Sequence, residues 1–376
     1  NSVRKNMSSN PEKNVLVLQG GGALGSYQGG AFEVLKENGW LTDWVAGVSI
    51  GAINAALIAG NPPEMRAGRL REFWELVTSD SLENSLAQGF SGRGIFNQLS
   101  AGMTMARGVT GFFRPRFPPA AFQLQGSTGA TSFYDTSPLR ATLLDLVDFD
   151  YLNQNHVRFS IGAVNVETGN MTWFDSTKQT IAPEHIMASG ALPPGFPAIQ
   201  IDGQHFWDGG LVSNTPLQYV YDEDHDDDLC IFQIDLFNAR GKLPGSVWQV
   251  ETRVKDIRFS SRTRFGTDAL CSVHAARGAH QRLYDKLPAK LRDDPDAKAL
   301  LAGGCDPKIT IAHLIYRQSK YENQSKDYEF SRASMHDHWQ AGGQDVTTTL
   351  NHADWRDRHL DSDRIRVFDL SASRTD

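Results

Sequence analysis

Residues 15–25, VLVLQGGGALG, place three consecutive glycines after an apolar run and decide how the chain begins to fold. The apolar run is rich in β-branched residues, which predicts a buried parallel strand over residues 14–19. The apolar spacing of residues 27–35 predicts a helix directly after the glycines. A glycine turn in this position offers backbone N–H groups to an anion. Because residues 20–25 also spell G-x-G-x-x-G, the anion is either the pyrophosphate of a dinucleotide or the oxyanion of a substrate carbonyl.

The composition is that of a globular protein. The chain has 376 residues, of which 40% are hydrophobic and 22% charged, and its net charge of −7 argues against a nucleic-acid-binding protein. No apolar run approaches the ~18 residues of a membrane span, and residues 1–13 read as a polar, flexible leader without the core of a signal peptide. We therefore expect a cytoplasmic protein, with peripheral contact to a membrane as the alternative.

The cysteines and the acidic residues do not predict a metal site. Cys230, Cys271 and Cys305 lie far apart and fit no metal or redox spacing, which favours a reducing compartment. The acidic run at 222–228 matches no calcium loop and is interpreted as a solvated loop. We expect neither a metal nor a cofactor.

Strands and helices alternate along the first part of the chain, which predicts an α/β domain. A second buried strand is expected at 44–48, and the apolar, small residues 50–59 predict a buried helix that ends before Gly60. Further strands are expected at 158–166, 171–174, 198–201, 204–207, 229–236, 308–316 and 365–370, and helices at 64–77 and 183–189. Asp202-Gly203 is a two-residue hairpin signal.

Two regions depart from this alternation. Residues 80–135 mix glycine, proline and aromatic residues with weak periodicity, and are interpreted as a surface excursion or as an apolar flap over a lipid site. Beyond residue 236, a helix is expected that carries Val250, Val254, Ile257 and Phe265 near one face and Arg253, Lys255, Arg258 and Arg262 elsewhere. Its basic side is interpreted as a solvated face, with contact to acidic lipid headgroups as the alternative.

The second glycine motif is Gly47-Val48-Ser49-Ile50-Gly51, a G-x-S-x-G. It falls at the end of a predicted strand and the start of a predicted helix. A serine on such a sharp turn exposes its hydroxyl, and the glycines relieve crowding around the strained backbone. The helix that follows directs its N-terminal dipole at the serine. This context makes Ser49 the candidate nucleophile.

A serine nucleophile needs a base, and Asp208 is the best candidate. It closes a predicted strand and precedes Gly209 and Gly210, which let the backbone pass close to a neighbouring group. A Ser-His-Asp triad has to be considered because the chain has 11 histidines. His185 and His205 are interpreted as structural, because one lies within a predicted helix and the other within a strand.

The three motifs resemble the patatin-like phospholipase family when taken in order. They are Gly20-Gly21-Gly22-x-x-Gly25, Gly47-x-Ser49-x-Gly51 and Asp208-Gly209-Gly210, and the run from Ala188 to Pro197 is similar to that family as well. The resemblance covers residues 14–236 and leaves 237–376 as a C-terminal α+β extension of open role. One departure is Leu24, where many members carry Arg or Lys.

The resemblance implies a three-layer α/β/α fold with a mostly parallel sheet, and a Ser-Asp dyad. Ser49 would be the nucleophile and Asp208 the base, while the N–H groups of Gly20, Gly21 and Gly22 would hold the oxyanion. The expected reaction is hydrolysis of the carboxylic ester of a phospholipid, a lysophospholipid or a related lipid through an acyl-enzyme, and transient contact with a membrane surface would suit such a substrate.

Two alternatives remain at the level of sequence. A dinucleotide-dependent oxidoreductase requires an acidic residue at the end of the second strand, whereas Asp43 precedes that strand and Ser49 follows it. A lipid-binding protein that has lost catalysis would keep the same motifs without turnover.

Overall fold

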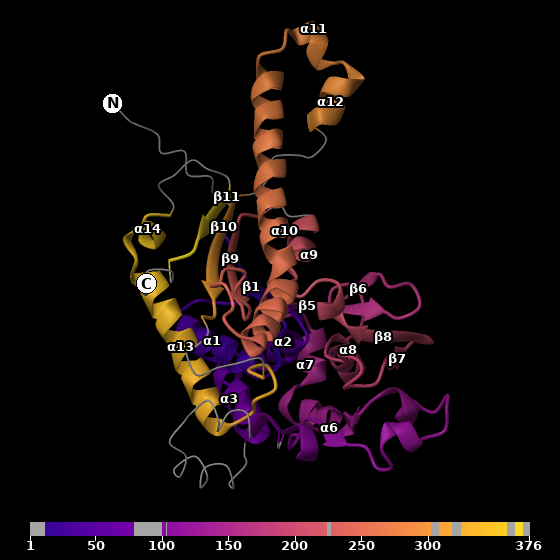
Figure 1. The fold of residues 1–376 in the computed structure, drawn as a ribbon. Coiled ribbons are helices and arrows are strands. Elements are labelled where there is room, and N and C mark those ends of the chain that lie inside the picture. The colour runs from indigo at the N-terminus through magenta and orange to yellow at the C-terminus, as the bar shows by residue number, and fades with distance from the viewer. Residues whose placement is uncertain are drawn as a thin grey trace.

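The computed structural model describes residues 12–78, 100–102, 104–223, 227–301, 308–317, 325–358 and 365–370. Its centre is a sheet of nine strands in the order β11-β10-β9-β1-β2-β5-β8-β7, with β6 also paired to β5. Helices cover the sheet, and one long helix projects away from it (Figure 1). Residues 1–11 of the predicted leader, residues 79–99 of the predicted insert, part of the acidic run and Cys305 lie outside the described residues, whereas Lys13, the last residue of the predicted leader, already belongs to the first strand.

The parallel part of the sheet is built from β1 (Lys13–Leu18), β2 (Trp44–Val48), β5 (Arg158–Asn165), β9 (Leu229–Asp235), β10 (Ile309–Ile315) and β11 (Ile365–Phe368). Five of these six strands are wholly or mostly buried, as strands covered on both faces by helices must be. The antiparallel part consists of β6 (Met171–Asp175), β7 (Ile199–Ile201) and β8 (Gln204–Asp208). A mixed α/β fold with a mostly parallel sheet is therefore confirmed.

The two faces of the sheet carry separate hydrophobic clusters. The larger one packs against α1 (Ser26–Glu37), α2 (Ile50–Ala59), α3 (Arg66–Val77) and α13 (Arg332–Asn351). The smaller one lies under α9 (Leu217–Asp222). The remaining helices are α6 (Ser137–Leu146), α7 (Phe149–Asn153), α8 (Pro183–Ser189), α10 (Val247–Asp285), α11 (Ala289–Arg292), α12 (Pro295–Leu301) and α14 (Ala353–Arg356). Short 3-10 turns lie at Gly22–Gly25, Ala120–Phe122, Thr128–Thr131 and Gly209–Leu211.

The hairpin between β7 and β8 forms as its sequence predicts. Asp202 and Gly203 have φ values of 49° and 80°, the backbone conformation that two-residue hairpins favour. The hairpin matters for the site because β8 ends at Asp208. A second, two-stranded sheet joins β3 (Arg114–Pro115) to β4 (Tyr134–Asp135) within the region predicted as an insert.

The C-terminal residues continue the same sheet. The strands expected at 308–316 and 365–370 form β10 and β11, and β10 pairs directly with β9. Helix α13 crosses α1 at very close range, since a Cβ added at Gly30 or Gly342 would overlap backbone atoms of the other helix. The segment predicted as an extension thus shares the sheet and core of the first 236 residues. Within the described part of the chain, no helix is long and apolar enough to cross a bilayer.

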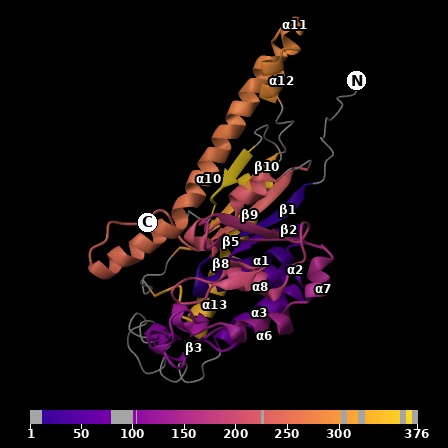
Figure 2. The same ribbon diagram turned by 90° about the vertical axis from the view of Figure 1, so that its right-hand side faces the viewer.

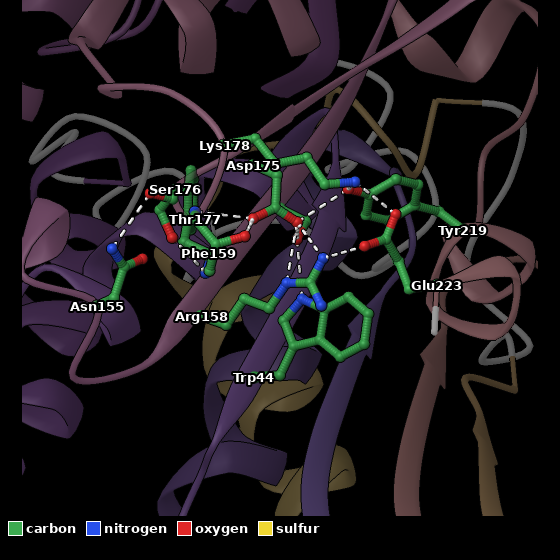
Figure 3. Close-up of polar contacts among 11 residues, drawn as sticks. Trp44, Asn155, Arg158, Phe159, Asp175, Ser176, Thr177, Lys178, Tyr219 and Glu223 are labelled. Atoms are coloured by element: carbon green, nitrogen blue, oxygen red, sulfur yellow. Dashed lines mark hydrogen bonds and ion pairs between the residues drawn. The ribbon is translucent and has the colours of Figure 1, made fainter. Parts of the chain in front are cut away.

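An ionic network around the buried Asp175 lies at the end of the sheet opposite the Ser49 turn (Figure 3). Arg158 at the start of β5 donates two hydrogen bonds to Asp175 at the end of β6, at 2.7 and 3.0 Å, and its guanidinium stacks over Trp44 of β2. Tyr219 of α9 donates to the same carboxylate at 2.9 Å. The network ties β2, β5, β6 and α9 together.

Candidate active site

Ser49 lies on a sharp turn between β2 and α2. Its φ of 57° is rare for a residue with a side chain, and such backbone strain is common where a nucleophile has to be presented. Gly47 and Gly51 make the turn possible, because an added Cβ at Gly47 would overlap the backbone of Gly51 and one at Gly51 would overlap that of Leu18. The G-x-S-x-G motif therefore has the geometry that its sequence predicts.

Ser189 fixes the turn from the other side. The Ser49 N–H donates to the Ser189 hydroxyl at 3.0 Å, and that hydroxyl donates to the Gly162 carbonyl of β5 at 2.7 Å. Ser189 is fully buried at the end of α8. Its role was not assigned from the sequence, although it stands within the run at 188–197 that carries the family resemblance.

Asp208 faces Ser49 from the end of β8. Its carboxylate accepts a hydrogen bond from the Gly210 N–H at 2.7 Å, and the Ser49 hydroxyl lies near enough to lower the pKa of the carboxyl. The residue is 2% exposed, and burial raises the pKa of the Asp208 carboxyl to about 6, while the Ser49 hydroxyl and the Gly210 N–H act in the opposite direction. Gly209 is required because an added Cβ would meet the Gly162 carbonyl. The structure thus brings the two residues chosen from the sequence together in the lining of one cavity.

The glycine loop lies beside Ser49 and lines the same cavity. The Gly20 N–H donates to the Asn214 carbonyl at 3.1 Å, and the Asn214 amide donates back to the Gly20 carbonyl at 3.0 Å. In the described part of the chain, the N–H groups of Gly21 and Gly22 have no backbone acceptor. Of the three donors expected from the sequence, Gly20 is therefore already engaged, and Gly21 and Gly22 are available to an anion.

Asp327, in the C-terminal part of the chain, packs against the glycine loop. Its carbonyl accepts the Ala23 N–H at 2.8 Å, and it lies so close to Gly22, whose φ is +55°, that an added Cβ would overlap it. The Asp327 carboxylate pairs with Lys255 of α10 at 2.7 Å. Gly25 is also necessary, because Ile50 and Trp74 fill the space next to it. Leu24, the departure from the family pattern, is fully buried in the core.

An apolar cavity of about 380 Å³ opens over Ser49 and Asp208. Its aromatic walls come from three parts of the sequence: Phe112, Phe113 and Tyr134 from the predicted insert, Phe196 from the run after α8, and Phe237, Phe259, Tyr328 and Phe330 from the C-terminal third. The first three place part of the segment 80–135 in the cavity wall, while its interpretation as an apolar flap over a lipid site stays a prediction. The C-terminal contribution was not foreseen from the sequence.

The histidines considered as triad members lie elsewhere. The ring of His185 accepts the Ala182 N–H at 2.9 Å and packs against Phe174, and His205 pairs with Glu167 at the surface. Neither lines the cavity. Both are structural, as expected. Cys230 is not suited to act as a nucleophile, since burial in β9 raises the pKa of its thiol to about 12.

Asp43 does not provide the acid of a dinucleotide site. It lies before β2, at the opposite end of that strand from Ser49, and its carboxylate accepts the Asn14 N–H at 2.8 Å. The end of β2, where a ribose ligand would stand, leads into Ser49. Among the described residues, no group of three or more His, Cys, Asp or Glu side chains could hold a metal ion.

Comparisons with solved structures give distant relatives. VipD from Legionella pneumophila is 14% identical, with a TM-score of 0.34 over 96% of this chain and 73% of VipD. The type III effector protein ExoU is 13% identical, with a TM-score of 0.36 over 93% of this chain and 54% of ExoU. ExoU in its heterodimeric complex with SpcU from Pseudomonas aeruginosa is 19% identical, with a TM-score of 0.32 over 60% of this chain and 44% of that one. No curated protein matches the chain.

Comparison with protein families gives two matches along the chain. Residues 16–221 match the patatin-like phospholipase family, and residues 257–362 match a family described as patatin phospholipase. The first match alone covers more than half of the sequence and contains Ser49 and Asp208. The chain therefore belongs to the patatin-like phospholipase family of lipid hydrolases.

Proposed function

We propose that this protein is a serine hydrolase that cleaves carboxylic esters of lipids through a dyad of Ser49 and Asp208. The observation that carries the proposal is that Ser49 and Asp208 line the same apolar cavity of about 380 Å³, with the Ser49 hydroxyl near enough to Asp208 to lower the pKa of its carboxyl. The cavity walls suit an acyl chain, because they consist mainly of aromatic and aliphatic side chains. The dyad suits acyl transfer, because it supplies a nucleophile and a base in the lining of one cavity.

The reaction begins with attack of the Ser49 hydroxyl oxygen on the ester carbonyl carbon, while the Asp208 carboxylate takes the hydroxyl proton. The tetrahedral intermediate carries a negative charge on the former carbonyl oxygen. The N–H groups of Gly21 and Gly22 and the N-terminus of α2 stabilise that charge. When the ester bond breaks, the leaving alcohol receives the proton from Asp208 and the acyl group stays on Ser49.

The second half of the reaction releases the acid. A water molecule attacks the acyl carbonyl while Asp208 accepts one of its protons, and the intermediate collapses with return of that proton to Ser49. The same two glycine N–H groups hold the oxyanion again. The resting geometry supports both steps, because Ser189 and Gly210 fix the backbone of Ser49 and the carboxylate of Asp208.

The decisive experiment compares Ser49→Ala, Asp208→Asn and Asp202→Asn in hydrolysis of a short-chain nitrophenyl ester and of a panel of phospholipids and lysophospholipids. We expect the first two variants to lose activity by about 10³-fold or more while they stay folded. Asp202→Asn is the matched control, because it makes the same chemical change in the exposed β7–β8 turn. A fluorophosphonate probe should label the wild type and not Ser49→Ala. If the folded wild type showed neither turnover nor labelling, the chain would be a lipid-binding protein without catalysis.

A further inference from the structure

The first turns of α10 are oriented the opposite way from an ordinary surface helix. Most of the residues that pack against the body are polar: Thr252, Asp256 and Ser260 are each less than 9% exposed, and Phe259 is the apolar residue beside them. The apolar residues on the other side form an exposed row, called here the α10 stripe: Val247 (71% exposed), Val250 (47%), Val254 (58%) and Ile257 (48%). Helices of globular proteins normally bury such a row, so this one is suited to an apolar partner. The sequence-based interpretation of the helix considered only its basic side.

The helix that carries the α10 stripe also reaches the substrate cavity. Phe259, two residues after Ile257, lines the cavity from the inner side of the helix. Its carbonyl accepts hydrogen bonds from Gln19 and Asn214, so this part of α10 is attached next to the glycine loop. Helix α10 therefore borders the cavity through Phe259, while the four stripe residues stay outside the cavity lining.

A second group of exposed apolar residues lies beside the cavity. Met105 and Leu192 line the cavity and are 55% and 37% exposed, which places the mouth next to them. The adjoining loop, residues 117–133, carries Phe117, Phe122, Leu124 and Phe133, all more than half exposed. The Phe133 N–H donates to the carbonyl of Pro194 in the cavity wall. Figure 2 shows the β3 segment and the start of α10 on the same side of the molecule, at the left of that view.

The two segments that carry these exposed apolar residues are basic, although the chain as a whole is acidic. Residues 104–133 contain three arginines and no acidic residue, and residues 238–260 contain five Lys or Arg against two acidic residues. The whole chain has a net charge of −7. Apolar side chains surrounded by cations, on the face where an ester cavity opens, match the interface of an anionic bilayer.

We propose that this face docks on the surface of a lipid bilayer that contains anionic lipids. The α10 stripe and the 117–133 loop enter the boundary between headgroups and acyl chains, while Arg240, Lys242 and Arg258 lie near the headgroups. In this orientation the cavity mouth faces the bilayer, so an acyl chain passes from the membrane to Ser49 without crossing water. The inference rests on the proposed function for its purpose, but the binding can be measured without catalysis.

The binding experiment uses full-length protein with Ser49→Ala, so that vesicle lipids stay intact. Cosedimentation is measured with vesicles of phosphatidylcholine alone or mixed with phosphatidylglycerol. A triple variant, Val250→Gln, Val254→Gln and Ile257→Gln, should lower partitioning by about tenfold or more. Arg240→Gln with Lys242→Gln should lower it by about fivefold per charge on the anionic vesicles and leave the weak binding to neutral vesicles unchanged. Leu41→Gln is the control, because Leu41 is 68% exposed and precedes β2, at the other end of that strand from Ser49.

The activity experiment keeps Ser49 and separates the docking from the chemistry. The triple variant should hydrolyse a soluble short-chain ester at the wild-type rate and vesicle lipids at least about tenfold more slowly. If the wild type fails on the soluble ester, the proposed function fails, while cosedimentation still tests the docking. Equal partitioning of the folded triple variant and the wild type would overturn the docking. So would a wild-type dimer that the triple variant converts to monomers while vesicle binding persists, since a second copy would then cover the stripe.

Discussion

At the scale of single residues, the candidate chemistry depends on an aspartate whose surroundings oppose its charge. Asp208 must be ionised to accept the proton of Ser49, and burial raises the pKa of its carboxyl to about 6, compared with an ordinary value of ~3.9. The same desolvation makes the carboxylate a stronger base once it has lost its proton. An aspartate can therefore serve at neutral pH in a position usually held by histidine.

This environment leads to a specific pH dependence. Because protonation of Asp208 removes the base, we expect kcat/KM for a soluble ester to rise with pH through an apparent pKa of about 6 and to level off above it. Initial rates between pH 4 and pH 9, with the fold monitored by circular dichroism, measure the profile. An acid limb near pH 4 in the folded protein would contradict a buried Asp208 as the base.

Ser49 and Asp208 could be predicted from sequence because each is marked by neighbouring glycines that its own backbone requires. The roles of Ser189 and Asn214 could not, since each acts on a residue at least 140 positions away, and the family resemblance around Ser189 does not reveal which residue it contacts. The N–H of Gly20 illustrates the same limit of prediction from sequence. The glycine run predicts three N–H donors, whereas only the fold reveals that Asn214 already engages the first.

At the scale of secondary-structure elements, the ionic network around Asp175 holds β5, β6 and α9 together. The Asp175 side chain is fully buried, and the hydrogen bonds from Arg158, Thr177 and Ser160 lower the pKa of its carboxyl to about 2 against the cost of desolvation. The folded state thus favours the ionised form. Its contribution to stability is present above the unfolded pKa of ~3.9 and is lost as the pH falls through 2.

We expect Asp175→Asn to lower the free energy of unfolding at pH 7 by about 2–4 kcal/mol, because the partly buried Arg158 loses one of its two acidic partners. The advantage of the wild type over the variant should begin to shrink below about pH 5 and should be lost as the pH falls through 2. Urea unfolding at several pH values measures both effects. Glu167→Gln removes the exposed pair with His205 and should leave the free energy of unfolding nearly unchanged. A similar loss in the two variants would contradict this account.

The crossing of α1 and α13 depends on glycines that leave no room for a side chain. A Cβ at Gly342 would overlap the Tyr27 carbonyl, whereas one at Gly68 of α3 would meet no atom within 4 Å. We expect Gly342→Ala to cost about 2 kcal/mol or more of stability through overpacking, and Gly68→Ala to add about 0.5–1 kcal/mol through helix propensity. Thermal unfolding of both variants measures the contrast. If the Gly342→Ala variant were more stable than the wild type, α1 and α13 would have to move apart without loss of stability, which would contradict this account.

Most elements could be predicted from sequence, because buried strands and hairpin turns carry local signals. The run at 14–19, the helix at 50–59 and the Asp202-Gly203 turn are examples, and all three are confirmed. The orientation of α10 could not be predicted. Its apolar residues have the spacing of a buried face, and only the polar contacts of Asp256 with Lys326 and of Lys255 with Asp327 explain why the other side faces inward.

At the scale of the whole molecule, the C-terminal third completes the site that the first 236 residues begin. It adds β10 and β11 to the sheet, packs α13 against α1, and supplies Phe259, Tyr328 and Phe330 to the cavity. Two ion pairs, Lys255 with Asp327 and Lys326 with Asp256, attach the segment around residue 327 to α10, each at 2.7 Å. The glycine loop is therefore held by Asp327, which lies about 300 residues further along the chain.

This arrangement makes Asp327 a candidate positioning residue for the proposed oxyanion donors. Its carbonyl holds the Ala23 N–H beside Gly22, and its carboxylate is held in turn by Lys255. We expect Asp327→Asn to lower kcat on a soluble ester by about 3- to 10-fold with KM nearly unchanged, because looser donors weaken the stabilisation of the transition state more than the binding of the substrate. Asp293→Asn is the matched control, because it breaks an exposed ion pair with Lys298 between α11 and α12. It should leave kcat unaltered. Steady-state kinetics at low and high salt should also show the wild type approaching the variant as salt screens the partly exposed pair. A variant with wild-type kcat would show that the glycine loop keeps its shape without the C-terminal segment.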